Sequence, residues 1–162
     1  MVKGSFKTLI FLTIFLLPMM ASAMAFAKPL YLFSELNGTV FRADKPVSGA
    51  KIERRYVWHW KDKTGEEIVV SDADGRFHFP AATESSLSAR LMPHEPVIQQ
   101  TIVISVDGKE YLAWKFTKHN YAEDGELLGK KLNLHCDLDA SEEYRLFDPK
   151  AKLGYMGICR LD

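Results

Sequence analysis

The sequence predicts an all-β fold, a single antiparallel β-sandwich of about seven strands. Three observations support this prediction. Apolar and polar residues alternate in short runs along most of the chain. Glycine, proline and aspartate separate these runs. Apolar residues almost never recur at the spacing of an amphipathic helix, apart from one short segment near the C-terminus.

In each expected strand, every second side chain faces the core. In chain order, the segments with a strand pattern are 30–33, 38–42, 44–52, 54–61, 68–71, 76–79, 101–106, 109–116 and 131–139, and about seven of them are expected to form the strands of the sandwich. Two Asp-Gly pairs predict hairpin turns, because these residues tolerate the positive φ that such turns require. Asp74-Gly75 would join 68–71 to 76–79, and Asp107-Gly108 would join 101–106 to 109–116.

A short helix is expected near the C-terminus. Asp139 and Glu142 resemble a capping box, and Ala140–Phe147 would form the helix before Pro149 ends it. The segment 85–96 is rich in serine and proline and is expected to be a long irregular connection. Connections of this length are often functional.

The N-terminus has the pattern of a secretory signal peptide. Lys3 and Lys7 precede a stretch, 8–27, that contains no charged residue. Its centre, 9–17, is almost entirely apolar, and Pro18 ends that run. A basic start, an apolar centre and small residues after it are the three parts of an export signal.

Two cleavage positions fit the small-residue pattern, one after Ala23 and one after Ala27. The sequence therefore predicts a signal peptide over 1–23, or up to residue 27, and one β-sandwich domain at 28–162. The protein would then be periplasmic or secreted. The alternative is an uncleaved leader that anchors the chain, since about 20 uncharged residues can span a bilayer.

Charge and composition exclude several classes of protein. Lysine plus arginine number 21 and aspartate plus glutamate also 21, so the whole chain has no net charge. Lys3 and Lys7 belong to the leader, which leaves the mature chain with two more acidic than basic residues. No basic excess is available for a nucleic-acid partner. The 47% of apolar residues is too high for a disordered chain.

The two cysteines, Cys136 and Cys159, predict a disulfide, because an oxidising compartment lets cysteines pair. The bridge would hold the C-terminal tail and contribute roughly 3 kcal/mol. Two alternatives remain open: buried free thiols, and metal ligation together with His135. Zinc normally takes further ligands at close spacing, and the sequence has none there.

Three segments carry a family resemblance: Gly38-Thr39-Val40, Pro46–Ile52 and Ser71–Phe79. They resemble the bacterial carboxypeptidase-regulatory-like, or transthyretin-like, β-sandwich, and the similarity covers about Gly38–Pro80. After Pro80 the Pro-Gly-x-Tyr strand typical of that family is missing. The resemblance implies a transthyretin-like or immunoglobulin-like sandwich in which the following residues are architectural: Gly38, Pro46, Gly49, Asp74, Gly75, Phe77 and Phe79.

The chain is also similar to small exported bacterial proteins of an uncharacterised family built on this sandwich. Some of them are encoded near type VI secretion genes, which implies an immunity-like or accessory role. The transthyretin-like group includes hydrolases of purine breakdown, but their Tyr-Arg-Gly-Ser ending is replaced here by Cys159–Asp162. The resemblance therefore implies a binding protein rather than an enzyme.

No motif in the sequence predicts catalysis, a metal site or a cofactor. Asp72 and Asp74 look like part of a calcium loop, but Val70 and Ala81 occupy positions where an EF-hand needs carboxylates. No G-x-S-x-G nucleophile motif is present. The five histidines show no paired metal-ligand spacing and are His59, His78, His94, His119 and His135.

Aromatic residues provide the candidate binding surface. Tyr56, Trp58 and Trp60 alternate, so on one strand they would form a stripe about 13 Å long. A buried stripe would be ordinary core, and an exposed one would anchor a protein partner or stack on sugar rings. The loop with Pro93, His94 and Pro96 is the second candidate surface, because its prolines hold it in a preformed shape.

From these observations we expect an exported, non-catalytic β-sandwich that binds another protein. The alternative is a carbohydrate- or envelope-binding module that uses exposed aromatic residues. A small hydrolase with an unrecognised site is a third, weaker alternative.

Overall fold

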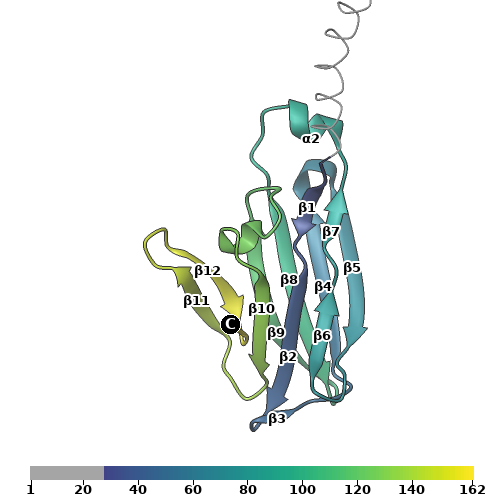
Figure 1. Ribbon diagram of the computed structural model, residues 1–162, viewed down its shortest axis with the longest axis vertical. Coiled ribbons are helices and arrows are strands. Elements are labelled where there is room, and N and C mark those ends of the chain that lie inside the picture. Colours follow the sequence, from purple (N-terminus) through teal and green to yellow (C-terminus); the bar gives the residue numbers. More distant parts are fainter. Residues whose placement is uncertain (1–27) are drawn as a thin grey trace, which may run out of the picture. The chain divides into compact units, whose positions relative to one another are not determined.

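Strands make up most of the described part of the chain (Figure 1), which confirms the all-β prediction. The computed structural model describes residues 28–162. The expected signal peptide, ending at Ala23 or Ala27, lies outside the described residues. The chain divides into two compact units. One contains Leu30–Glu84 and His94–Asp162, and the other contains Ser85–Pro93, which is described separately.

A six-stranded antiparallel sheet has the order β11-β12-β9-β8-β4-β5. Its strands, in chain order, are β4 (Lys51–Trp58), β5 (Lys63–Val70), β8 (Ile98–Val106), β9 (Lys109–Lys118), β11 (Glu143–Asp148) and β12 (Leu153–Gly157). β8 and β9 form the expected hairpin, with Asp107 and Gly108 at positive φ in its turn. β11 and β5 are the two edges of this sheet.

The second sheet contains β2 (Leu36–Arg42) at its centre. β2 pairs with β3 (Lys45–Pro46), β6 (Arg76–Phe79) and β10 (Leu132–Asp137), and β10 also pairs with β13 (Arg160–Leu161). β10 runs parallel to β2, which departs from the expected antiparallel arrangement. β1 (Leu30–Phe33) and β7 (Ala82–Glu84) form a separate two-stranded sheet.

The inward faces of these strands build one apolar cluster. Ile52, Ile104 and Trp114 enter it from the six-stranded sheet, and Val40 and Phe79 enter it from the second sheet. Each of these side chains is fully buried or nearly so. Alternation along a strand is what places them inside while their neighbours face solvent.

The expected hairpin between 68–71 and 76–79 is wrong, because its two arms belong to different sheets. β5 pairs with β4, and β6 pairs with β2. The Asp74-Gly75 turn is present, with Gly75 at φ 73°, and the Gly75 carbonyl accepts a hydrogen bond from the amide of Val40 at 2.8 Å. This bond attaches the turn to β2, so the chain crosses from one sheet to the other.

The expected C-terminal helix is also wrong, because Glu143–Asp148 is the strand β11. Asp139 does not cap a helix: its carboxylate accepts a hydrogen bond from the backbone amide of Ala43 at 2.9 Å. Tyr144 and Leu146 alternate with Arg145 and pair with β12 in register. Long-range pairing therefore outweighs the local capping signal.

The segment 85–96 contains one element that the sequence did not predict. The short helix α2 (Leu87–Leu91) begins at Ser86, whose hydroxyl accepts a hydrogen bond from the amide of Ala89 at 3.2 Å. No helix in the described part of the chain, residues 28–162, is long and apolar enough to cross a membrane.

Gly38 lies directly beneath the ring of Phe77 in the core, and the two residues are paired in register. A methyl group at Gly38 would overlap that ring, so Gly38→Ala is expected to lower the free energy of unfolding by about 1–3 kcal/mol. Urea denaturation measures the change. The neighbouring Thr39→Ala, on the opposite face of β2, is the control and should stay within about 0.5 kcal/mol of the native protein. Equal stability of all three proteins would contradict the prediction.

Candidate binding site

The predicted aromatic stripe is divided by the end of β4. Tyr56 and Trp58 share the inward face of β4, and Trp58 is only 2% exposed. Trp60 lies beyond the strand, in the 3₁₀ turn His59–Lys61. The turn ends at Asp62, whose left-handed backbone (φ 49°) redirects the chain into β5. Tyr56 and Trp58 are therefore largely core residues, and Trp60 is separated from them.

Trp58, Trp60, His94 and Tyr121 form an aromatic cluster. The Trp58 indole Nε1 donates a hydrogen bond to the Tyr121 hydroxyl at 2.9 Å. The Tyr121 hydroxyl lies 2.8 Å from Nε2 of His94. The His94 imidazole stacks on the Trp60 ring, with ring centres 4.0 Å apart and planes 19° from parallel. One chain of contacts thus joins the buried Trp58 to the half-buried Trp60.

Chemistry fixes the direction of one hydrogen bond in this chain. An indole nitrogen can only donate, so the Tyr121 oxygen accepts from Trp58. Between Tyr121 and His94, the donor depends on which imidazole nitrogen carries the proton. Burial raises the pKa of Tyr121, although the hydrogen bond from Trp58 acts in the opposite direction. Tyr121 is therefore a hydroxyl over the whole neutral range.

The loop that carries Tyr121 is anchored by a buried ion pair. Lys118, the last residue of β9, and Glu126, in the 3₁₀ turn Gly125–Leu127, are 3.0 Å apart, and neither side chain is more than 1% exposed. The Lys118 ammonium also donates to the Ala122 carbonyl at 2.8 Å, one residue after Tyr121. This contact fixes the start of the loop and with it the position of Tyr121.

Glu126 is held by three further hydrogen bonds. Ser34 donates from its hydroxyl at 2.6 Å and from its backbone amide at 3.0 Å, and the Gln100 amide donates at 2.7 Å. Burial by itself would raise the pKa of Glu126, but the Lys118 charge and these hydrogen bonds outweigh it, so the pKa is lowered. Burial lowers the pKa of Lys118, against the attraction of Glu126. The carboxylate is thus ionised at neutral pH.

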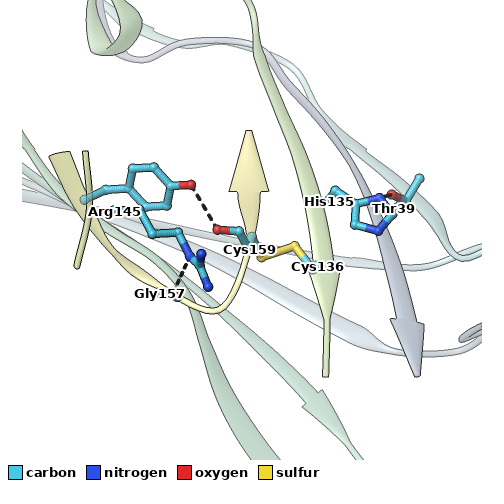
Figure 2. The surroundings of a disulfide bond; sticks show 7 residues. Thr39, His135, Cys136, Arg145, Gly157 and Cys159 are labelled. Carbon is cyan, nitrogen blue, oxygen red and sulfur yellow. Dashed lines mark hydrogen bonds between the residues drawn. A yellow bond between two sulfur atoms is a disulfide. The ribbon is translucent and has the colours of Figure 1, made fainter. Parts of the chain in front are cut away.

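Figure 2 shows the disulfide between Cys136 and Cys159, which confirms the predicted pairing. Cys136 lies on β10, and Cys159 comes directly before β13, which pairs with β10. Both cysteines are fully buried, and the Tyr155 hydroxyl donates a hydrogen bond to the Cys159 carbonyl at 2.9 Å. His135 lies on the exposed face of β10, stacked on Phe41, so it is not a partner of the sulfur atoms.

Comparison with known proteins places the chain in a family. The family model described as "Domain of unknown function (DUF6795)" matches residues 36–141. The chain belongs to this family. Among curated proteins no sequence matches the chain. The DUF6795 match contains the aromatic cluster and Cys136, whereas β11, β12 and Cys159 follow it.

Among solved structures, the chain is similar to catechol 1,2-dioxygenase from Acinetobacter sp. ADP1 inhibited by bound mercury. The two share 17% identity at a TM-score of 0.32, and the alignment covers 81% of this chain and 51% of that one. The chain thus spans about half the length of that enzyme, and a similarity this low carries no argument about activity.

The remaining predicted residues of this DUF6795 protein are spread over the fold. Pro96 is half-buried and follows His94, whereas Pro93 belongs to the segment Ser85–Pro93 that is described by itself. Gly49 and Gly75 have positive φ in turns, Pro46 lies in β3, and Phe77 is buried in the core. No group of three or more histidine, cysteine or acidic residues within 28–162 is placed to hold a metal ion.

Sequence reasoning missed Tyr121, Lys118 and Glu126. Tyr121 joins His94 only because β8 and β9 pair along their whole length, which places the loop after β9 beside the segment before β8. Charged residues are almost always expected at the surface, so a buried pair has no local signal in the sequence.

Proposed function

We propose that the protein is an exported, non-catalytic binding module that recognises another protein in the bacterial envelope. The proposed role is immunity-like or accessory to a secretion system, and the proposed location is the periplasm or the exterior. The resemblance to transthyretin-like sandwiches supports a scaffold role for the strands, with the loops at their ends making contact. The contact surface is the half-exposed part of the aromatic cluster, Trp60 and His94.

One observation carries this proposal: Trp60 is held in place before any partner binds. His94 stacks on it at 4.0 Å, and the Tyr121 hydroxyl fixes His94 at 2.8 Å. Tryptophan and tyrosine dominate the binding energy of protein interfaces. A prearranged side chain loses less conformational entropy on binding, so it contributes more to affinity.

A catalytic function is not proposed, because a reactive pair needs access to substrate. Within residues 28–162, Ser34 and Lys118 resemble a nucleophile and base, with the hydroxyl 3.4 Å from the ammonium. Both residues are completely buried. The Ser34 hydroxyl also donates to Glu126, so it is committed to the buried network.

The test compares the native protein with Trp60→Ala as bait in co-purification from envelope extracts of the source cells. We expect a partner that the native protein retains and Trp60→Ala loses, with affinity reduced at least about 30-fold, or ~2 kcal/mol. His59→Ala is the matched control, because His59 is exposed in the same turn. Equal retention by all three proteins, with unchanged thermal stability, would contradict the proposed surface.

A carbohydrate- or envelope-binding module is the second candidate, favoured by a groove of about 470 Å³ that β2, β6 and β10 line together with the end of β5. Asn37, Arg76, His78 and Asn133 line it with amide and charged groups of the kind that bind hydroxyls. Peptidoglycan pull-down distinguishes the two candidates. Binding that Asn133→Ala abolishes and Trp60→Ala leaves intact would favour this second function.

A further inference from the structure

β9 and β12 separate after a short contact, and this separation opens a groove in the six-stranded sheet. Met156 of β12 faces Lys115 of β9, and no later residue of β9 has a strand partner in β12 within the described chain. The groove has a volume of about 440 Å³ and reaches from Phe116 to Tyr144 on β11. This volume suits a few side chains of a bound segment.

Exposed apolar side chains continue from the groove to the edge of the sheet. Tyr144 is 58% exposed, Leu146 51% and Met156 37%. Tyr144 and Met156 face each other in register on β11 and β12, and Leu146 follows on the same face of β11. Single exposed apolar residues are common, but an adjoining set of this kind marks an interaction surface.

The charge of the groove is positive. Lys115 and Lys152 line it, and neither has an ion-pair partner among residues 28–162. No lining residue is a carboxylate. Glu95 is not a lining residue, but its carboxylate lies 3.0 Å from Nδ1 of His119, which does line the groove. A partner with carboxylates would complement these two ammonium groups.

We propose that this groove binds an extended acidic segment of a partner protein, at a surface separate from Trp60. Apolar side chains of the segment pack against Tyr144 and Met156, and its carboxylates pair with Lys115 and Lys152. A second copy of this chain fits less well, because a twofold contact would bring the same lysines together.

The experiment uses two fluorescein-labelled octapeptides, one alternating leucine with aspartate and the other leucine with lysine. Fluorescence anisotropy measures their binding to the purified exported protein. We expect the aspartate peptide to bind at least 10-fold more tightly than the lysine peptide. In the double variant Lys115→Glu/Lys152→Glu this preference should reverse.

The matched control is Lys45→Glu/Lys109→Glu, which changes the net charge equally. Lys109 lies six residues before Lys115 on β9, about 20 Å away along the strand. This control should keep the preference for aspartate, and so should Trp60→Ala. Because Trp60→Ala tests the other surface, the outcome here is independent of the proposed function.

Three results would overturn the inference. The first is equal affinity for both peptides, and the second is an unchanged preference in Lys115→Glu/Lys152→Glu. The third is evidence that something else occupies the groove. This would be a dimer of the chain that Met156→Lys disrupts. It would also be binding to phosphatidylglycerol vesicles that Lys115→Glu/Lys152→Glu abolishes, with no binding of either peptide.

Discussion

Glu126→Ala is expected to lower the free energy of unfolding by about 3–5 kcal/mol, because it leaves the Lys118 amine buried and without its counterion. The variant also removes the acceptor for the hydroxyl of Ser34 and the amide of Gln100. Each buried donor left without an acceptor adds to the cost. Urea denaturation followed by tryptophan fluorescence measures the change, since Trp58 and Trp114 are both buried.

Two further variants separate the charge effect from general disruption of the loop. Lys118→Met/Glu126→Leu replaces both charges with apolar side chains, and it should recover much of the lost stability. Glu123→Ala changes an exposed carboxylate of the same loop and should stay within about 0.5 kcal/mol of the native protein. If Glu126→Ala lowered the free energy of unfolding no more than Glu123→Ala does, the ion pair of Lys118 and Glu126 would not anchor the loop.

Acidification should weaken the native protein through the same residue. The pKa of Glu126 is lowered in the fold, so its stabilising contribution is present above the pKa of the unfolded carboxyl, near 4.5. That contribution is lost as the pH falls through the lower, folded pKa. Thermal unfolding from pH 7 to pH 3 should therefore show a difference in melting temperature between the native protein and Glu126→Gln that becomes smaller below pH 4.5. A difference in melting temperature that does not change with pH would contradict an ionised Glu126.

The sequence was sufficient for features that depend on neighbouring residues. The alternation of apolar and polar residues predicted most strands, as in β8 and β9, and Asp107-Gly108 predicted the turn between them. The disulfide followed from the presence of two cysteines and a predicted export signal. The residues that determine a strand or a turn lie close together in the chain. Two cysteines allow only one disulfide pairing.

Features that depend on distant residues were not predictable. The Asp139 and Glu142 pattern would start a helix in isolation, but β12 offers Glu143–Asp148 a strand partner. Trp60 continued the alternation of β4, but the chain must turn at Asp62 for β5 to pair with β4. Lys118 and Glu126 look like surface charges until the loop folds back on β9. Only the packed structure decides these three cases.

Loss of the disulfide should cost about 3 kcal/mol, as expected for a loop closed by residues 23 apart. Cys136→Ala/Cys159→Ala removes it, and chemical denaturation measures the cost. Mass spectrometry of the non-reduced protein verifies the bond in the native chain. A native protein with two free thiols, or a double variant of unchanged stability, would contradict this prediction.

Loss of the disulfide should destabilise mainly the C-terminal strands. β13 pairs with β10 over only two residues, and β12 pairs with β9 in register at Met156 alone, so the bridge holds a segment with few strand contacts. Hydrogen exchange in the double variant should rise in β12 and β13 and change little in β4 and β8. Because Met156 and Tyr144 depend on this segment, the aspartate peptide should bind more weakly, whereas binding at the proposed Trp60 surface should be unchanged.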